Sequence, residues 1–384
     1  MSAVRTYLDY NATSPLRPDA REAMLRALDA FGNASSVHAE GRRARAMIEA
    51  ARGEVAALAG AASRDVTFTS GATEAANWVL SQPWRTVLVS AVEHPAVMVP
   101  AQRSGARVEV IPVDRSGRID PDRLSVLIDG ALGSDGESAA DSVLVAVQHA
   151  NNETGVVQPI AEITALAHER GVRVMVDAVQ TAGRVALNQR GHAIDFMVLS
   201  SHKIGGPQGA GALVMHEAAK LDPLIAGGGQ ERGLRAGTEN VAAIAGFGAA
   251  AAASRRDLGR TEHLAGLRNT LEAALMHATP DLAVIGSDTE RLCNTSLVAL
   301  PGAAAETAVI ALDLAGVAAS AGAACSSGKT NRSPVLAAMG IGDDIARCAV
   351  RFSIGWATTE EDISRCISAW QRVDRIRSGV REVA

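Results

Sequence analysis

Between residues 65 and 214, short and almost purely apolar runs alternate with longer segments in which apolar and polar residues are mixed. Such runs are typical of strands that are buried on both faces of a parallel sheet. The mixed segments are long enough for helices that cover the sheet, as in repeated βαβ units. We therefore predict an α/β fold with parallel strands at 65–68, 86–89, 143–147, 172–176 and 196–199.

Helical signals flank and follow this sheet. The segment 38–58 is rich in Ala, Arg and Glu, and Gly60 suits the C-cap of such a helix. Asp120 and Pro121 form a typical N-cap and first-turn pair for a second helix. The alanine-rich segment 241–254 predicts a buried helix whose length could bridge two domains.

After residue 261 the pattern changes to longer helical segments, which are separated by predicted strands at 296–300 and 351–354 and followed by an amphipathic helix at 360–373. A chain of 384 residues exceeds what one hydrophobic core usually serves. We predict a large domain over 15–255 and a small domain formed by 1–14 and 256–384.

Composition narrows the functional class. A net charge of -5 argues against binding to nucleic acid or to anionic membranes as the main role. The sequence has neither an apolar N-terminal segment typical of a signal peptide nor a run long enough to span a bilayer. Its four cysteines lack CxxC spacing, and no HExxH pattern occurs among its nine histidines. We therefore predict a cytoplasmic protein without a metal site.

Two charged residues follow neighbouring predicted strands. Asp177 comes directly after the run 172–176, and Lys203 lies just beyond the run 196–199. Open α/β sheets bind ligands at the carboxyl ends of their strands. Pyridoxal phosphate needs a lysine for its Schiff base and a carboxylate against its pyridine nitrogen. The pair therefore indicates a pyridoxal-phosphate site, although each residue alone could be a solvated strand cap.

The segment TSGATE, residues 69–74, follows the first predicted strand and opens a helix. Backbone N–H groups at a helix N-terminus bind anions, so Ala72 and Thr73 are candidates for holding a cofactor phosphate. The same residues also fit a capping box, with Thr69 or Ser70 as the cap and Glu74 in the first turn.

Two further polar clusters follow predicted strands. His94, after the strand 86–89, could stack on a cofactor ring and move protons, or it could be a turn residue held by Pro95. With aromatic residues at only 3% of the chain, few other side chains could stack on the ring, which favours the first interpretation. Asn152, after the strand 143–147, offers an amide to a ring oxygen, or it belongs to a polar turn closed by Gly155.

Taken in order, the motifs resemble those of cysteine desulfurases of the NifS/IscS kind, in the class V branch of fold-type I pyridoxal-phosphate enzymes. The resemblance runs from Tyr7 to Gly355 and rests on TSGATE, EHPAV, NNETGVVQPI, DAVQ, SSHK, GGGQERGLRAGTEN, SAGAACSSG and RFSIG. It implies a large domain with a mainly parallel seven-stranded sheet between helices and a smaller α+β C-terminal domain. It also implies a pyridoxal-phosphate-dependent homodimer.

The resemblance assigns roles to individual positions. Thr238 would reach the phosphate of the neighbouring subunit, and Arg351 would clamp the substrate carboxylate, although a strand-end arginine could also form a surface ion pair. The implied cofactor-binding residues are Ala72, Thr73, His94, Asn152, Asp177, Gln180, Ser200, His202, Lys203 and Thr238. The implied catalytic residues are Cys325, Lys203 and His94, and the implied substrate-binding residues are Arg351, Asn152 and Asn11.

Cys325 decides which reaction is expected. It lies in a run of small residues, 320–328, that packs little and could move toward a substrate; alternatively it is a half-buried cysteine near a turn. In the family that the chain resembles, this cysteine takes sulfur from L-cysteine as a persulfide and alanine is released. Lys329 and Arg332 could favour its thiolate. The other three cysteines fit structural positions: Cys293, Cys348 and Cys366.

The resemblance therefore implies sulfur transfer from L-cysteine, for iron–sulfur cluster assembly or another pathway, with a sulfur-acceptor or iron–sulfur scaffold protein as a possible partner. Two alternatives remain open. One is another class V enzyme, either an aminotransferase or a selenocysteine lyase, which would keep Lys203 and Asp177 but would not need Cys325. The other is a non-enzymatic partner subunit that retains the fold.

Overall fold

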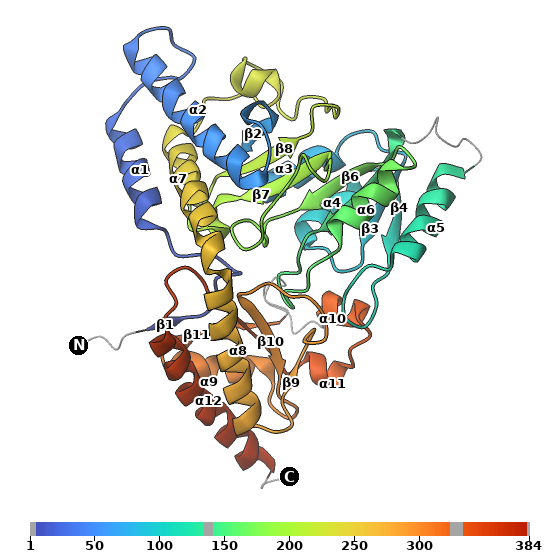
Figure 1. The fold of residues 1–384 in the computed structure, drawn as a ribbon, viewed down its shortest axis with the longest axis vertical. Helices are drawn as coiled ribbons and strands as arrows, with labels where there is room; N and C mark the ends of the chain where they lie inside the picture. The colour runs from blue at the N-terminus through green and yellow to red at the C-terminus, as the bar shows by residue number, and fades with distance from the viewer. Residues whose placement is uncertain (1–4, 134–140, 323–332, 382–384) are drawn as a thin grey trace.

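The computed structural model describes residues 5–133, 141–322 and 333–381. Its main feature is a seven-stranded sheet in the order β2-β8-β7-β6-β5-β3-β4 (Figure 1). Neighbouring strands from β7 to β4 run parallel, whereas β8 is antiparallel to both β7 and β2. The strands are β2 Val66–Thr69, β3 Thr86–Ser90, β4 Arg107–Ile111, β5 Val143–Gln148, β6 Arg173–Asp177, β7 Phe196–Ser200 and β8 Gly211–Met215.

The apolar runs are continuous because both faces of the central strands are buried. In β5, Val143, Val145 and Val147 belong to one hydrophobic cluster, whereas Leu144 and Ala146 belong to another on the opposite face. This alternation follows from the two-residue period of a strand. Each face therefore needs its own layer of helices.

The helices form those two layers. Side chains of α2, α5, α6 and α7 join the cluster on one face, and α1 packs on α7. Side chains of α3 and α4 join the cluster on the other face. The bounds are α1 Pro18–Asp29, α2 Ala39–Ala59, α3 Ala72–Leu80, α4 Pro95–Arg103, α5 Pro121–Leu132, α6 Ile160–His168 and α7 Val241–Asp257.

The C-terminal part has a separate antiparallel sheet in the order β12-β13-β10-β9. Side chains of α8, α9 and α12 pack on one face, and those of α10 on the other. The strands are β9 Ala283–Val284, β10 Thr295–Ala299, β12 Ser320–Ala321 and β13 Ala349–Ser353. The helices are α8 Thr261–Ala278, α9 Ala305–Leu314, α10 Pro334–Ala338, α11 Asp343–Ala346 and α12 Glu360–Arg381.

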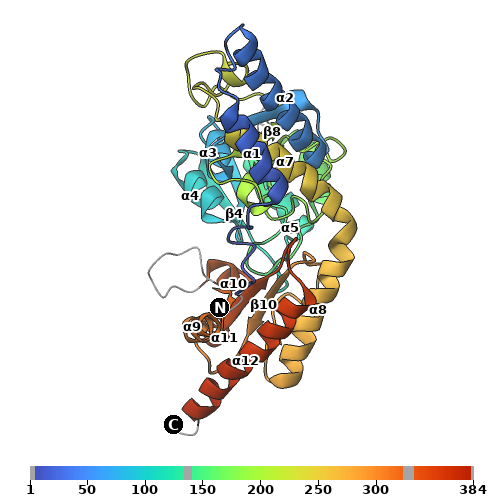
Figure 2. The same ribbon diagram turned by 90° about the vertical axis from the view of Figure 1, so that its left-hand side faces the viewer.

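Two connections join the sheets. Helix α7 continues through the short 3-10 turn Leu258–Arg260 into α8, so one long helical rod runs past both sheets (Figures 1 and 2). At the N-terminus, β1 Thr6–Tyr7 pairs in parallel with β11 Val317–Ala318. This pairing brings the N-terminal arm next to the C-terminal sheet.

Several local predictions are confirmed. Gly60 is the left-handed C-cap of α2, with φ 66°, and the side chain of Asp120 accepts a hydrogen bond from the backbone N–H of Asp122 as the N-cap of α5. The last helix continues to Arg381, beyond the predicted end at residue 373. None of the helices in the described part of the chain has the length and hydropathy that crossing a membrane requires.

Candidate active site

A cavity of about 650 Å³ lies at the carboxyl ends of β6 and β7 and reaches the N-terminal arm and β13. Most of the predicted site residues line it, although they come from segments far apart in the sequence. They are Asn11, Ala72, Thr73, His94, Asn152, Asp177, Gln180, Ser200, His202, Lys203 and Arg351. The sheet thus brings together the side chains that follow its strands, as expected for an open α/β sheet.

Asp177 and Lys203 face this cavity from neighbouring strands. Asp177 ends β6, and its Oδ1 accepts a hydrogen bond of 2.9 Å from the N–H of Val179. Lys203 lies in a 3-10 turn directly after β7, and its Nζ donates to the carbonyl oxygens of Asn11 at 2.5 Å and Ala12 at 2.8 Å. Burial raises the pKa of Asp177 to about 6, although that hydrogen bond and the charge of Lys203 oppose the shift.

This environment fits pyridoxal phosphate. Within residues 5–133, 141–322 and 333–381, no basic side chain forms a direct ion pair with the half-buried Asp177 carboxylate. A cationic group brought in by a ligand would offset the cost of burying that carboxylate. A protonated pyridine nitrogen is such a group, and the lysine beside it is the residue that pyridoxal phosphate requires.

The predicted phosphate cradle is the N-terminus of α3. Its N-cap is Gly71, without a side-chain cap, so the predicted cap at Thr69 or Ser70 is wrong. Glu74 instead accepts a hydrogen bond of 3.0 Å from the backbone N–H of Ser70. The first turn of a helix leaves N–H groups without intrahelical acceptors, and here that turn lines the cavity.

Two glycines keep this cradle open. A Cβ atom at Gly71 would meet nothing within 4 Å, so the space beside the helix end is free. A Cβ at Gly211 on β8 would lie 2.6 Å from the backbone of Gly71, so only glycine permits this close approach of strand and cradle. The space and the donors together fit a phosphate group.

His94 combines both interpretations made from the sequence. It is the N-cap of α4, where its Nδ1 accepts a hydrogen bond of 3.0 Å from the N–H of Ala96, and its side chain also lines the cavity. Burial and the charge of Lys203 lower its pKa to about 4, so the imidazole is neutral at pH 7. Because Nδ1 accepts, Nε2 carries the proton.

Ser200 is the last residue of β7, and His202 lies in the turn that follows it, next to Lys203. The ring nitrogen Nδ1 of His202 is 3.2 Å from Oγ1 of Thr13, and Ser200 is buried. Burial and the neighbouring Lys203 charge lower the pKa of His202 to about 4. Both side chains can therefore act as neutral hydrogen-bonding groups toward a ligand.

The amide side chains link the N-terminal arm to the sheet. Asn11 Nδ2 donates to the carbonyl oxygen of Asn152 at 3.1 Å and to Oγ1 of Thr295 at 2.9 Å. Gln180 Nε2 donates in turn to the carbonyl oxygen of Asn11 at 3.1 Å. The arm is therefore a wall of the cavity, held by both sheets.

Arg351 is a buried donor and not a surface residue. It lies on β13, is 2% exposed, and donates to Asp9 Oδ1 at 2.8 Å and to the carbonyl oxygen of Asn152 at 2.9 Å. Among the residues that the structure describes, its Nε has no hydrogen-bond acceptor. The predicted alternative of a surface ion pair is wrong, and the guanidinium retains N–H groups for an anionic ligand.

Three residues that contact the site were not found from the sequence: Asp9, Glu93 and Arg184. Asp9 was overlooked although it lies in the motif that starts at Tyr7, because nothing in its spacing indicates the partner Arg351. Arg184 contacts Gln180, four residues earlier. That separation of about one helical turn was the available signal.

Glu93 lies beside Asp177 in the buried end of the sheet. One carboxyl oxygen accepts a hydrogen bond from the N–H of Gln148, which pairs with Asp177 across β5 and β6. The other has no hydrogen-bond partner in the described part of the chain. Burial and the Asp177 carboxylate raise the pKa of Glu93 well above its ordinary range. The place of Glu93 in the sequence, directly before His94, does not indicate its contact with Asp177.

Two predicted site residues are not among those that the described structure places at the cavity. Cys325, with Lys329 and Arg332, lies outside the described residues. Thr238 is exposed and does not line the cavity of its own chain. Of the remaining cysteines, Cys366 is fully buried and Cys293 half-buried, and burial raises the pKa of both thiols.

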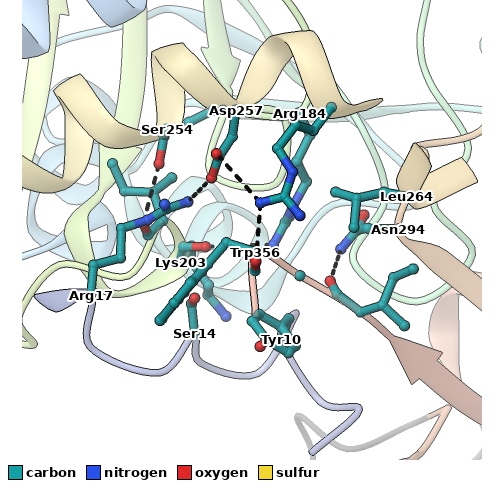
Figure 3. Close-up of a pocket in the computed structure, with 16 residues that line it drawn as sticks. Tyr10, Ser14, Arg17, Arg184, Lys203, Ser254, Asp257, Leu264, Asn294 and Trp356 are labelled. Atoms are coloured by element: carbon teal, nitrogen blue, oxygen red, sulfur yellow. Dashed lines mark hydrogen bonds and ion pairs between the residues drawn. The ribbon is translucent and has the colours of Figure 1, made fainter. Parts of the chain in front are cut away.

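A smaller cavity of about 40 Å³ lies on the other side of Lys203, near the junction of α7 and α8 (Figure 3). There Arg17 pairs with Asp257 at 2.7 Å and lies over the ring of Trp356. Arg184 also lines this cavity. Lys203 lines both cavities and therefore stands in the wall between them.

Comparisons with known proteins identify the family of this chain. Residues 6–366 match the family described as aminotransferase class-V. The cysteine desulfurase IscS of Dictyoglomus turgidum is 37% identical over 379 residues, which cover 96% of this chain and 94% of that protein. The cysteine desulfurase IscS 1 of Archaeoglobus fulgidus is 38% identical over 386 residues, which cover 97% of this chain and 98% of that protein.

A NifS-like protein from Rickettsia africae has a similar structure, with a TM-score of 0.88 and 33% identity over 97% of this chain and 100% of that one. The chain thus belongs to the class-V aminotransferases, whose fold implies dependence on pyridoxal phosphate, and within them to the cysteine desulfurase family of the NifS/IscS kind. The resemblance found in the motifs and the fold class that it implied are confirmed.

Proposed function

We propose that this chain is a pyridoxal-phosphate-dependent cysteine desulfurase that takes sulfur from L-cysteine, releases L-alanine and carries the sulfur as a persulfide. The observation that carries the proposal is the meeting of Asp177, Lys203 and Arg351 in one cavity of a chain from this family. An aminotransferase or selenocysteine lyase would share the first two residues.

The cofactor would lie between the cradle of α3 and Asp177. The first turn of α3, with Ser200 and His202, would hold its phosphate, and Asp177 would keep its pyridine nitrogen protonated. When bound, pyridoxal phosphate supplies an electron sink for the bonds at the substrate α-carbon. His94, neutral and lining the cavity, would cover the ring.

The substrate L-cysteine would be held by its carboxylate on Arg351, with Asn11 and Asn152 beside it. Lys203 Nζ would take the proton from the substrate α-carbon and return a proton later in the reaction. Its hydrogen bonds to the arm at Asn11 and Ala12 hold it at the cavity wall, from where it reaches the space in front of Asp177.

Cys325 would accept the sulfur. Its thiolate attacks the sulfur of the substrate, an S–S bond forms, and the bond between that sulfur and the substrate β-carbon breaks. The electrons left on carbon take up protons, which gives alanine, and the sulfur remains on Cys325 as a persulfide. A reductant or an acceptor protein, such as an iron–sulfur scaffold, would then remove it, and a reducing cytoplasm suits such a thiol.

We also infer a homodimer. Thr238 lies outside the cavity of its own chain, as it would if it served the phosphate of a second copy. Apolar side chains on and after α1 are exposed, including Leu28 at 65% and Phe31 at 78%, and they would be covered in such a pair. Sedimentation of the purified protein tests this directly.

The deciding experiment is to give L-cysteine to the pure protein with bound cofactor and to measure alanine with and without a reductant. If the enzyme carries the sulfur as a persulfide, it should form about one equivalent of alanine per subunit without a reductant. With a reductant it should form many equivalents. Transfer of an amino group to an added oxo acid would instead support an aminotransferase. Higher activity with selenocysteine than with cysteine would favour a selenocysteine lyase.

A further inference from the structure

Arg184 lines the smaller cavity (Figure 3) and contacts the two turns that carry Gln180 and Lys203. Its Nη1 donates to the side-chain Oε1 of Gln180 at 2.6 Å and to the carbonyl oxygen of the same residue at 2.7 Å. Its Nη2 lies 3.5 Å from the carbonyl oxygen of Lys203. One guanidinium therefore joins the turn after β6 to the turn after β7.

This guanidinium is half-buried, and its place in the protein interior requires an explanation. In the described part of the chain it forms no ion pair with a carboxylate, and the nearby ionisable groups are Cys293 and a second arginine, Arg351. Burial lowers the pKa of Arg184 to about 10, so it is still charged at neutral pH. Even a partly buried cation without a counter-ion costs free energy unless its N–H groups donate hydrogen bonds.

The contact fixes the orientation of the Gln180 amide. A guanidinium has only donors, so the amide atom facing it must be the oxygen, and the NH₂ group must point the other way. Nε2 accordingly donates to the carbonyl oxygen of Asn11 at 3.1 Å. Because Gln180 lines the larger cavity, its second N–H is the group available to a ligand there.

We propose that Arg184 is a positioning residue, which acts through Gln180 so that this side chain presents N–H donors to the phenolic ring oxygen of bound pyridoxal phosphate. The inference rests on the proposed function. A donor at that oxygen favours its anionic form, whereas a reversed amide would set a carbonyl oxygen against it. The orientation thus changes the pH at which the visible absorption of the bound cofactor titrates.

The test is a spectroscopic pH titration of the purified holoenzyme and its variants. In Arg184→Met the midpoint of the cofactor band should rise by about one pH unit, as expected for the loss of one oriented hydrogen bond to an anion. Arg184→Lys keeps a cationic donor and should recover part of the shift. Arg260→Met is the matched control, since Arg260 contacts Trp356 and Asp257 beside the same small cavity but not Gln180.

A double-mutant cycle separates positioning from a general charge effect. In a Gln180→Ala background, Arg184→Met should cause no further shift, because the amide through which it acts is gone. Fully additive shifts would overturn the inference. The other ionisable groups at the larger cavity are identical in all variants: His94, Asp177, His202, Lys203 and Arg351.

Thermal unfolding and cofactor content show whether each variant folds. If Arg184→Met does not, Gln180→Glu carries the test. In this variant the carboxylate would bind Arg184 and present an oxygen to the cofactor. The titration midpoint of the cofactor band should therefore be higher in Gln180→Glu than in Gln180→Ala, and equal midpoints would overturn the inference. A wild-type protein that binds no cofactor would refute the proposed function together with this inference. A cofactor band that is unaffected by Arg184→Met would refute the inference alone.

Discussion

Arg351 and Asp9 form a hydrogen-bonded ion pair of 2.8 Å between β13 and the N-terminal arm. The second carboxylate oxygen of Asp9 accepts a hydrogen bond of 2.8 Å from the hydroxyl of Ser320 on β12. One carboxylate therefore connects the arm, the proposed substrate clamp and the strand that leads toward Cys325. Oδ1 holds the guanidinium in its direction, and Oδ2 anchors the carboxylate to β12.

Replacing Asp9 should therefore weaken substrate binding. For Asp9→Ala we expect the KM for L-cysteine to rise about tenfold, the equivalent of one charge-assisted hydrogen bond, with kcat changed less. Asp9→Asn keeps an acceptor oxygen, so its KM should lie between that of the wild type and that of Asp9→Ala. Steady-state alanine assays measure this, with cofactor absorption as the check on folding. A lower KM in Asp9→Ala would mean that Asp9 competes with the substrate for Arg351.

Lys203→Ala should abolish turnover and leave the fold intact, because the side chain contacts the cavity wall and not the core. Borohydride reduction of the wild type should attach the cofactor to the peptide that contains Lys203, and no attachment should occur in the variant. Asp177→Asn should still bind cofactor but lose most of the rate, since a neutral amide holds the pyridine proton poorly. Borohydride labelling at another lysine would contradict the assignment.

The sheet and the main charged pair could be predicted because their signals are local. A strand buried on both faces is a continuous apolar run, and Asp177 and Lys203 follow such runs directly. The two-residue strands β9 and β12 carry no such signal. Their pairing depends on neighbours that are distant in the sequence.

The supporting contacts could not be predicted for the same reason. Asp9 and Arg351 lie 342 positions apart, and neither residue type indicates the other. Glutamate is usually a surface residue, and only the tertiary fold buries Glu93 beside Asp177. Sequence patterns therefore identified many of the side chains that line the cavity and missed residues such as Asp9 and Glu93 that lie behind them.

The cysteines provide a test of the sulfur chemistry. Cys325→Ser should bind the cofactor normally but form no persulfide and little alanine, because an alcohol is a far weaker nucleophile than a thiolate at neutral pH. Cys293→Ser, Cys348→Ser and Cys366→Ser should each remain active. Mass spectrometry after one turnover should find the added sulfur on Cys325. Its appearance first on another cysteine would refute the assigned mechanism.

Glu231 should be a major determinant of stability. It is 6% exposed, accepts two hydrogen bonds from Arg52 at 2.7 and 2.9 Å, and accepts another from the N–H of Phe68 at 2.9 Å. Its removal leaves the buried Arg52 guanidinium with only the more exposed carboxylate of Glu49, so Glu231→Ala should cost about 3 kcal/mol of unfolding free energy.

The control for Glu231 is Glu49→Ala. Glu49 also contacts Arg52, but its side chain is 53% exposed, so its loss should cost under about 1 kcal/mol. Urea unfolding monitored by circular dichroism measures both variants. Equal effects would show that burial does not decide the strength of these two contacts.

Glu153 should make stability depend on pH. Its buried carboxyl accepts a hydrogen bond of 2.6 Å from the hydroxyl of Ser333, and burial raises its pKa from 4.5 to about 7, against the opposing effect of Arg351. Between these two pH values the unfolded chain releases the proton first, so the free energy of unfolding falls as pH rises and levels off above pH 7.

Glu153→Gln removes this titration. Relative to the wild type, the variant should gain about 2 kcal/mol of unfolding free energy between pH 5 and pH 8, because the wild type alone must bury an ionising carboxyl there. Urea unfolding at pH 5, 6.5 and 8 measures the difference. Glu306→Gln, an exposed substitution on α9, controls for the loss of a carboxylate elsewhere. If the wild type and Glu153→Gln show the same dependence on pH, Glu153 does not titrate on unfolding in this range.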